Sequence, residues 1–386
     1  MSRVRVREVV SVLGGGTPRR SVPEYYGGDI PWVTPKDMKQ RIIIGAQISL
    51  TEEGVNNSPA KVVPPGSVLV VVRSGVLKHT LPVALTTKPV TLNQDMKALV
   101  PAAEVDARYL VHMVKALEST VLSWVRATTA DNWPIDSLLD HEISLPGLRE
   151  QRRIAAILDQ ADSLRAMRCI TVRRLELLAQ ELYESQFATA PRNAVLSDAI
   201  ASLTGGKNLV GGDDSCNSRR VLKISAVTSG TYRETESKPL PDGYEPPSDH
   251  LVRPGDVLIS RANTSALVGA SALVGSTSGN MVLPDKLWRA TPHVHVSPTF
   301  LVATLQARRV RSEISARATG TGGSMKNISK PRLLSTPIHL PQLAIQQRFA
   351  EQVLATQRAR EVAIAHLESF DVLFGSLQHR AFRGEL

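Results

Sequence analysis

An internal repeat constrains the fold of this chain more than any other feature of its sequence. Positions 132–187 align without a gap to positions 327–382, and fourteen of the paired residues are identical, whereas average residue usage predicts about three or four. Shorter matches at a slightly smaller offset join the front parts of the two halves, namely Gly15-Gly16 with Gly205-Gly206 and Pro65-Gly66 with Pro254-Gly255. The chain is therefore a tandem duplication, and each half should fold as a copy of one unit.

The first part of each half has the pattern of a mixed α+β domain. Residues 62–75 and 250–263 each place a Pro-Gly turn before a short run of Val, Leu and Ile that is typical of a buried strand. Short helices are predicted around 106–122 and 298–316. Each half is thus expected to begin with short strands, turns and a few short helices.

The second part of each half has the pattern of a long helix. From Arg149 to Phe187 there is no Gly or Pro, and apolar residues recur at steps of three and four, the spacing of a narrow seam. The predicted seam comprises Ile154, Ile157, Ala161, Leu164, Leu175, Leu178 and Leu182, and in the second copy Phe349, Val353, Ile364, Leu367, Phe370, Phe374 and Leu377. Two equal rods of about 57 Å most simply pair lengthwise as a coiled coil. The predicted division gives globular domains at 1–145 and 191–340 and long helices at 146–190 and 341–386.

The charge distribution favours a polyanionic partner. The 386 residues include 46 Lys and Arg against 36 Asp and Glu, a formal net charge of +10 with a pI near 9.8. The long helices are almost neutral, whereas residues 1–148 carry +2 and residues 185–344 carry +7. Basic domains joined by neutral rods fit two heads that contact a phosphate backbone.

The sequence also excludes several classes of protein. No stretch approaches the roughly eighteen apolar residues of a membrane-spanning helix, and the N-terminus lacks the pattern of a secretory signal. Two cysteines, Cys169 and Cys216, fit a reducing cytoplasm better than a disulfide scaffold. The sequence contains no phosphate-binding loop, no dinucleotide-binding glycine pattern and no amino-methyltransferase motif. We therefore expect a cytoplasmic protein without a catalytic site of its own.

Two other interpretations remain open. Asp29, Asp37 and Lys39 follow the Asp…Asp-x-Lys order with which some nucleases hold a metal ion, so a stand-alone metal-dependent nuclease is one alternative. A coiled-coil scaffold that joins proteins without nucleic acid is the other. His293 and His295 have no further ligands at suitable spacing, and we expect them in an exposed strand and not at a metal ion.

Basic and amide side chains recur in corresponding loops of the two halves. Asn and Gln amides match the edge of adenine, while Arg and Lys match guanine or phosphate. In the first half the candidate DNA-binding residues are Lys36, Arg73, Ser74, Asn93, Gln94, Lys97 and Arg126. In the second half they are Arg261, Asn263, Lys286, Arg289, Ser324 and Lys326. Their recurrence predicts one DNA-binding face in each half.

Several segments together resemble the specificity subunit of type I restriction–modification systems. They follow one another along nearly the whole chain as GGGTPRR, YYGGDIPWVTPKDM, NQDMKALVP, ISLPGLREQRRIAAILDQAD, LPDKLWR, GTGGSMKNISK, IHLPQLAIQQRFAEQV and AFRGEL. The resemblance implies an α+β fold in which two mixed α/β target-recognition domains are joined by two long antiparallel α-helices that form a coiled coil, with a pseudo-twofold internal repeat. This chain departs from the family pattern at Asp95, where a glycine is common, and at 343–347, which differ from 148–152.

The resemblance also implies a function. Each recognition domain would read one half of a bipartite, asymmetric target in double-stranded DNA, and the helices would set the spacer between the halves. The chain would be a non-catalytic subunit that binds two modification subunits, which methylate adenine, and restriction subunits that translocate and cleave DNA. S-adenosylmethionine, ATP and magnesium are expected on those partner subunits, with no cofactor on this chain.

Overall fold

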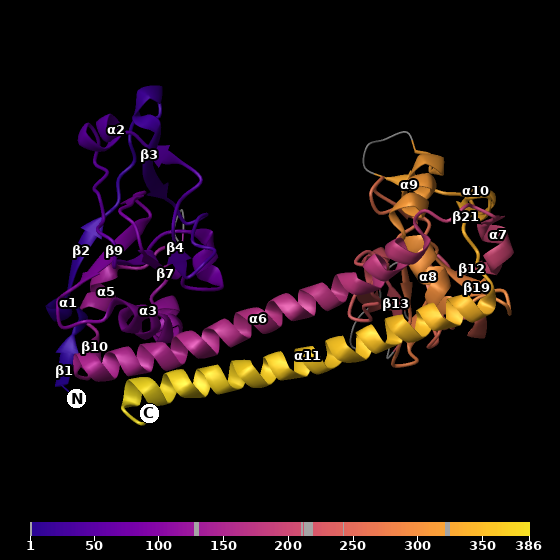
Figure 1. Ribbon diagram of the computed structural model, residues 1–386. Helices are drawn as coiled ribbons and strands as arrows, with labels where there is room; N and C mark the ends of the chain where they lie inside the picture. The colour runs from indigo at the N-terminus through magenta and orange to yellow at the C-terminus, as the bar shows by residue number, and fades with distance from the viewer. Residues whose placement is uncertain (1, 127–130, 210, 212–218, 242, 321–324) are drawn as a thin grey trace. The chain divides into compact units, whose positions relative to one another are not determined.

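The chain forms two compact units, each a mixed α/β domain with sections of two long helices. The structure is a computed structural model that describes residues 2–126, 131–209, 211, 219–241, 243–320 and 325–386 (Figure 1). Unit 1 comprises Met1–Cys169 with His366–Leu386, and unit 2 comprises Ile170–Ala365. Cys216 lies outside the described residues. In the part of the chain that is described, no helix is both long and apolar enough to span a membrane.

The two long helices are α6 (Leu148–Phe187) and α11 (Leu343–Arg383), of 40 and 41 residues. In unit 1, Arg165 of α6 pairs with Asp371 of α11 at 2.6 Å. In unit 2, Glu176 of α6 pairs with Arg360 of α11 at 2.7 Å. In unit 1 Arg153 also bonds to the carbonyl of Leu386, and in unit 2 Gln186 bonds to Gln352. In each unit, later residues of α6 therefore contact earlier residues of α11, so the helices run antiparallel. The fold class expected from the sequence is confirmed, with two mixed α/β domains joined by two long antiparallel helices.

One residue of the predicted apolar seam does not lie in it. Leu164 is 43% exposed, although its spacing placed it among the seam residues. Arg165, the next residue, makes the contact with α11 instead, through Asp371 and through the ring of Phe374 at 4.8 Å. Successive residues on a helix point about 100° apart. Since Arg165 faces α11, Leu164 is turned towards solvent.

Unit 1 is built on a five-stranded sheet of order β2-β9-β6-β7-β4 and a three-stranded sheet of order β5-β3-β8. The Val-rich strand that follows the Pro-Gly turn at Gly66 is fully buried in the larger sheet, as the sequence predicted. The strands are β1 (Ser2–Arg5), β2 (Val10–Gly14), β3 (Tyr26–Val33), β4 (Ile42–Ile43), β5 (Ser49–Leu50), β6 (Val68–Val71), β7 (Val83–Thr86), β8 (Thr91–Leu92), β9 (Met96–Pro101) and β10 (Glu142–Leu145). The helices are α1 (Val6–Val9), α2 (Glu52–Asn56), α3 (Ala107–Ala116), α4 (Glu118–Ser123) and α5 (Ile135–Leu139), with 3-10 turns η1 (Pro23–Tyr25) and η2 (Gly75–Lys78).

Unit 2 repeats this plan, with sheets of order β12-β19-β15-β17 and β14-β13-β18. Its strands are β11 (Ala194–Val195), β12 (Ile200–Gly205), β13 (Arg220–Leu222), β14 (Ser237–Pro239), β15 (Val257–Ser260), β16 (Ala262–Asn263), β17 (Ser271–Leu273), β18 (Met281–Val282), β19 (Leu287–Pro292), β20 (Lys326–Asn327) and β21 (Pro337–Ile338). Its helices are α7 (Leu196–Ala199), α8 (Pro298–Gln306), α9 (Arg308–Arg317) and α10 (Lys330–Leu334), with η3 (Ile224–Val227) and η4 (Ser248–His250). The helix pairs α3–α4 and α8–α9 confirm the short helices predicted around 106–122 and 298–316.

Buried glutamines fix the start of each long helix in the same way. Gln151 accepts a hydrogen bond from the N–H of Asp106 and donates to the carbonyls of Glu104 and Pro146. Gln346 accepts from the N–H of Ser297 and donates to the carbonyls of His295 and Pro341. In both units the amide ties the long helix to the residue that precedes a shorter helix of the domain, α3 or α8. This identity in the repeat therefore has a structural cause.

The structure corrects the alignment of the paired glycines by one residue. A Cβ on Gly15 would lie 1.7 Å from the Asn93 carbonyl oxygen, and a Cβ on Gly206 would lie 1.7 Å from the Leu283 carbonyl oxygen. These two glycines, and not Gly15 and Gly205, occupy the same place in the fold. Only glycine permits the chain to approach the loop between β8 and β9, or between β18 and β19, so closely.

Candidate nucleic-acid interface

The candidate residues of the first half gather at one end of the sheets of unit 1. Arg73 and Ser74 follow β6, and the loop 93–95 connects β8 to β9. The N–H groups of Val72 and Arg73 both donate to the carbonyl of Asp95, which joins the two loops. Arg126 and Arg73 each form a β-bridge with Asn132. We call this surface the strand-end face of unit 1, formed by residues 34–36, 73–74, 93–97 and 126.

Lys36 belongs to the same face because it follows a neighbouring strand. β3 runs parallel to β8, so their C-terminal ends lie together, and the N–H of Asn93 donates to the carbonyl of Val33. The exposed Lys36 lies in the turn after β3, which Asp37 closes by accepting hydrogen bonds from the N–H and hydroxyl of Thr34. A turn of this kind presents its lysine to solvent while its aspartate is occupied.

The two amides of the loop 93–95 differ in their surroundings. Asn93 is buried, and both polar atoms of its side chain bond to Asp95, the amide to the carboxylate at 3.0 Å and the oxygen to the backbone N–H at 3.2 Å. Gln94 is exposed and bonds to the hydroxyl of Thr17. Lys97 is half-buried in β9 opposite Gly14. Gln94 is therefore the accessible amide of this loop, while Asn93 holds the loop in shape.

The corresponding residues of unit 2 also come together. The N–H of Arg261 donates to the carbonyl of Lys286 at 3.0 Å, and the N–H of Ile328 donates to the carbonyl of Arg261 at 2.9 Å. Asn263 in β16 pairs with Lys326 in β20. We call residues 261–263, 285–286 and 326 the strand-end face of unit 2. Ser324, the remaining candidate, lies outside the described residues.

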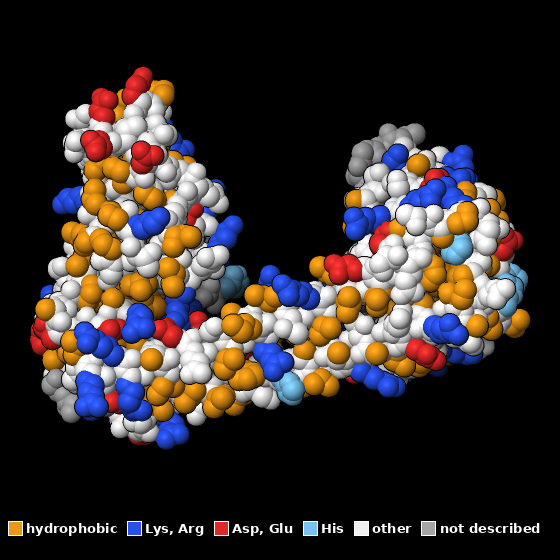
Figure 2. All heavy atoms as spheres, viewed as in Figure 1, with side chains coloured by type: hydrophobic (Ala, Val, Ile, Leu, Met, Phe, Trp, Pro, Cys, Tyr) orange, Lys and Arg blue, Asp and Glu red, His pale blue; other side chains and the backbone are white. Residues whose placement is uncertain are grey.

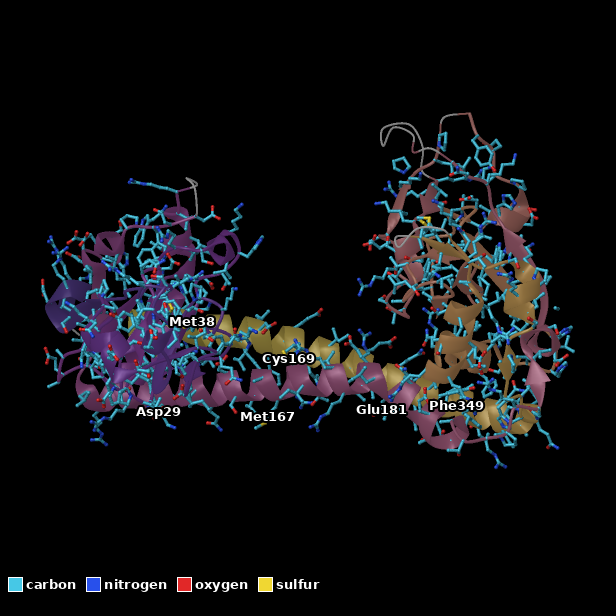
Figure 3. All side chains as sticks on the ribbon, turned by 90° about the horizontal axis from the view of Figure 1, so that it is seen from above. Asp29, Met38, Met167, Cys169, Glu181 and Phe349 are labelled. Carbon is cyan, nitrogen blue, oxygen red and sulfur yellow. The ribbon has the colours of Figure 1, made fainter. Side chains whose placement is uncertain are left out.

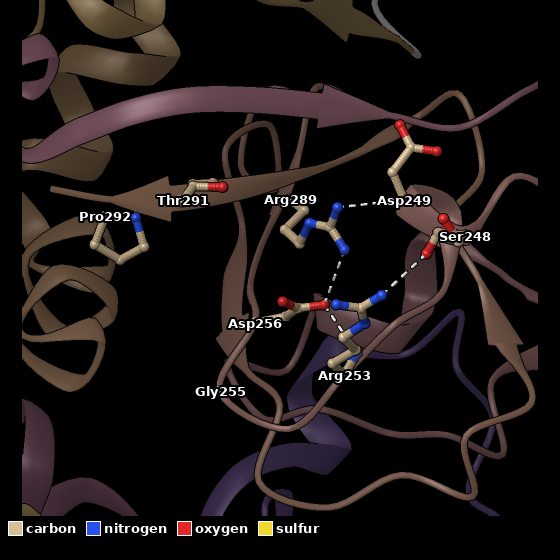
Figure 4. A pocket seen from close by; sticks show the side chains of 9 residues that line it. Ser248, Asp249, Arg253, Gly255, Asp256, Arg289, Thr291 and Pro292 are labelled. Atoms are coloured by element: carbon tan, nitrogen blue, oxygen red, sulfur yellow. Dashed lines mark hydrogen bonds and ion pairs between the residues drawn. The ribbon is translucent and has the colours of Figure 1, made fainter. Parts of the chain in front are cut away.

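Arg289 lies apart from the other candidates of unit 2. Its guanidinium donates to the carbonyls of Leu251 at 3.1 Å and Asp249 at 2.6 Å and lies 3.5 Å from the carboxylate of Asp256 (Figure 4). These partners precede β15, whereas the strand-end face is formed by residues that follow it. The side chain is only 14% exposed. Arg289, Asp249 and Asp256 line a surface cavity, and these contacts give Arg289 a structural role in its wall.

Two acidic residues and one lysine were missed by the sequence reasoning. Asp95 pairs with Arg73 at 2.5 Å, and Asp285 lies 3.8 Å from Arg261, so each strand-end face holds an Arg–Asp pair. The repeated order, an arginine after one buried strand and an aspartate before the next, could have indicated both pairs. The exposed Lys207 lies beside Pro284 and packs over Tyr244, and its place directly after Gly205-Gly206 was the available signal.

The described residues do not support the metal-dependent nuclease. Within them, no group of three or more His, Cys, Asp or Glu side chains is placed to hold a metal ion. Asp37 is occupied in its turn, where it also accepts from the N–H of Gln47. The prediction of an exposed strand at His293 and His295 is wrong, because β19 ends at Pro292 and the two rings stack in the turn that leads to α8. The carbonyl of His293 accepts a hydrogen bond from the N–H of Val296 at 2.9 Å, which closes that turn.

The long helices expose a second kind of surface. Figure 2 shows hydrophobic side chains on the outside of the helical parts, and Figure 3 shows Met167 projecting from α6. In unit 1 the exposed apolar residues on the helices are Leu164, Met167, Val372 and Leu373. In unit 2 they are Ile170, Leu177, Ile345, Leu354 and Val362. Contiguous apolar surface is typical of a face that another protein covers, whereas single exposed apolar side chains are ordinary.

Comparison with known sequences identifies the first half directly. Residues 1–170 match the family described as the type I restriction modification DNA specificity domain. The specificity subunit of the type I restriction enzyme EcoR124I/EcoR124II of Escherichia coli is 39% identical over 160 residues, 41% of this chain and 40% of that protein. The MjaIX specificity subunit of Methanocaldococcus jannaschii is 29% identical over 190 residues, 47% of this chain and 43% of that protein. The chain therefore matches less than half the length of these curated relatives.

Solved structures extend the likeness to the whole fold. A chain from a type I restriction–modification system, solved in work on complex assembly and conformational transition, has a TM-score of 0.65 at 17% identity over 100% of this chain and 98% of that chain. The S subunit of a type I system from M. genitalium has a TM-score of 0.53 at 14% identity, over 99% and 96% of the two chains. Residues 1–170 therefore match the type I restriction modification DNA specificity domain, and the solved type I chains share the fold of the whole chain.

Proposed function

We propose that this chain is the non-catalytic subunit that recognises DNA in a type I restriction–modification complex, with each unit reading one half of a bipartite, asymmetric target. The observation that carries the proposal is the strand-end face, which occurs once in each unit on the same strands. The side chains on the two faces differ, as Gln94 and Arg126 in unit 1 and Asn263 and Lys326 in unit 2 illustrate. A common scaffold with different contact residues suits a target whose halves have different sequences.

We propose further that the long helices bind two modification subunits through their exposed apolar side chains. These helices are almost neutral, so burial of apolar surface would stabilise the complex more than charge would. The modification subunits would bring S-adenosylmethionine, and the restriction and translocase subunits would bring ATP and magnesium. The complex would act in the cytoplasm.

Site-specific methylation tests the proposal. The chain would be purified alone and together with the modification subunits encoded beside it, and each sample incubated with a randomised DNA library and S-adenosylmethionine. We expect adenine methylation at one bipartite sequence from the complex and none from the chain alone. Methylation by the chain alone, or methylation without a shared sequence, would contradict the proposal.

The helices offer a separate test of the spacer. Seven residues, about two helical turns or 10 Å, would be inserted between Cys169 and Ile170 and between Ala365 and His366, so that both helices lengthen together. We expect the spacer of the methylated target to grow by about three base pairs while both half-sites stay the same. Insertion of the same seven residues in the loop 243–247 is the control and should leave the spacer unchanged.

Salt dependence tests the proposal against a scaffold that joins proteins without nucleic acid. Phosphate contacts release counterions, so DNA binding by the assembled complex should weaken steeply as salt rises. An assembly that is retained on its protein partners but never on DNA, even at low salt, would favour the scaffold.

A further inference from the structure

Arg73 on the strand-end face of unit 1 is held along one edge and open along the other. Its Nε donates to Oδ1 of Asp95 at 2.6 Å, and its Nη2 lies 2.5 Å from the same oxygen. Among the described residues, Nη1 has no acceptor, and the side chain is 49% exposed. A guanidinium has five N–H donors in a fixed plane. With the Nε edge occupied, the donors that remain on Nη1 and Nη2 form a parallel pair directed away from Asp95.

Asp95 is itself fixed in place. Its second carboxylate oxygen accepts from the amide of Asn93 at 3.0 Å, and its backbone carbonyl accepts from the N–H groups of Val72 and Arg73. Asn93 is buried, and its side-chain oxygen accepts a hydrogen bond from the N–H of Asp95. The chain Asn93–Asp95–Arg73 therefore limits the rotation of the guanidinium before any ligand binds, which lowers the entropy cost of binding.

The charge at this place favours a base over a phosphate. Two parallel donors match the O6 and N7 acceptors of guanine in the major groove, and they also match two phosphate oxygens. Asp95 is 22% exposed and lies against the guanidinium, so the pair carries almost no net charge. A phosphate brought to Arg73 would also approach this carboxylate and be repelled, whereas the edge of guanine carries no formal charge.

We propose that Arg73 reads a guanine in the half-site recognised by unit 1, and that Asp95 and Asn93 are positioning residues that aim its guanidinium. The inference rests on the proposed function and names the contact by which one strand-end face selects its sequence. Unit 2 carries the looser version of the pair, since Arg261 lies 3.8 Å from Asp285 and its buried Nε has no hydrogen-bond partner among the described residues. The proposal of an arginine that is fixed in place before DNA binds therefore applies to unit 1.

The experiment measures base preference at every target position by methylation of a randomised library, using the full chain with its modification subunits. Arg73→Ala should lower discrimination by about 10- to 100-fold at one guanine and leave the other half-site unchanged. Arg73→Lys keeps the charge but not the paired donors, so general DNA affinity should persist while preference at that position is lost. Asp95→Asn keeps the size of the side chain and should lower the same preference by about tenfold, and Asn93→Ala should act in the same direction.

Matched controls separate positioning from loss of structure. Arg7 and Asp140 form a pair of similar length, 2.7 Å, in the same unit but outside the strand-end face, so Asp140→Asn should leave the base profile unchanged. If Arg73→Ala weakens methylation equally on all sequences and reduces the salt dependence of binding by about one phosphate, Arg73 contacts the backbone and the inference is wrong. An unchanged profile in Asp95→Asn would refute the positioning role. A wild-type complex without a bipartite target would instead overturn the proposed function, and this inference with it.

Discussion

The loop that follows β6 in unit 1 and the loop that follows β15 in unit 2 occupy the same place but are fastened by opposite charges. In unit 1 the carboxylate of Glu118 accepts from the N–H of Leu81 and the hydroxyl of Thr80, both at 2.6 Å. In unit 2 the guanidinium of Arg311 donates to the carbonyls of Val268 at 2.6 Å and Ala266 at 2.8 Å. Both anchors lie on the second helix of the pair, α4 or α9. The fold therefore requires an anchor at this place, but not a particular side chain.

The two units also differ in an ionic network beside α6. Among the described residues, only unit 1 has this network. In unit 1 Asp159 of α6 pairs with Arg41 and, at 2.9 Å, with the buried His112 of α3. The residue at the repeated position in unit 2 is Leu354, which is 46% exposed. Duplication thus preserved the strands and the glutamine anchors, while the polar contacts around the domains diverged. Under the proposed function, divergence of this kind would let the two units acquire different DNA preferences on one scaffold.

The largest loss of stability is expected from the glutamine anchors, which the two units share. Gln151→Leu and Gln346→Leu each remove three buried hydrogen bonds and leave backbone groups without partners, so each should cost its own unit about 3 kcal/mol of stability. Urea unfolding with hydrogen exchange in α3 and α8 measures the two costs separately. The exposed Gln160 and Gln357 provide controls, since their change to Leu should cost less than about 0.5 kcal/mol. Clearly unequal costs would contradict an equivalent role in the repeat.

A smaller, one-sided effect is expected from the ionic network. Asp159→Ala leaves the buried His112 without its carboxylate, while Arg41 keeps Asp162 at 2.7 Å, and should destabilise unit 1 by about 2 kcal/mol. Leu354→Ala should change unit 2 by less than about 0.5 kcal/mol. Hydrogen exchange in each unit is the measurement. Equal destabilisation of both units by their respective variants would show that the network adds nothing specific to unit 1.

The same network predicts how unit 1 responds to acid. Burial by itself would raise the pKa of Asp159, but the hydrogen bond from His112 and the charges of Arg41 and Arg108 outweigh it and hold the pKa below its ordinary value. A carboxyl with a lowered pKa stabilises the folded state above its unfolded pKa of about 3.9, and the contribution is lost as the pH falls through the folded pKa. Unit 1 should therefore lose stability below about pH 4. Unfolding midpoints should be measured from pH 6 to pH 2.5. The stability of unit 1 should fall less steeply with pH in Asp159→Asn than in the wild-type chain.

The smallest losses of stability are expected at the side chains that anchor the two loops, Glu118 and Arg311. Glu118→Ala and Arg311→Ala should each cost about 1 kcal/mol, because both side chains are partly exposed and their partners can turn to water. Each variant should loosen only the loop of its own unit, seen as faster exchange at 76–81 or at 265–270. Methylation should then weaken at one half-site and not the other. Loss at both half-sites would contradict independent recognition by the two units.

The fold could be predicted much further than the site. Periodicity predicted both long helices, the absence of Gly and Pro supported the first of them, and the Pro-Gly turns predicted β6 and β15. Most candidate residues of each unit do come together, because loops after neighbouring strands meet at one edge of a sheet. What could not be predicted was which polar atoms are already occupied. Asn93 and Arg289 have the residue types of DNA contacts, yet their donors bond within the protein.

The sequence by itself determined the duplication, the α+β character of each half and the two rods, because these depend on patterns of residues close together in the chain. Only the tertiary structure decided that Leu164 faces solvent, that Asp95 holds Arg73 and that Arg289 supports the turn before β15. Such partners lie tens of residues apart in the chain. They are brought together by strand pairing and packing, and residue type alone does not reveal whether a polar group is paired or open.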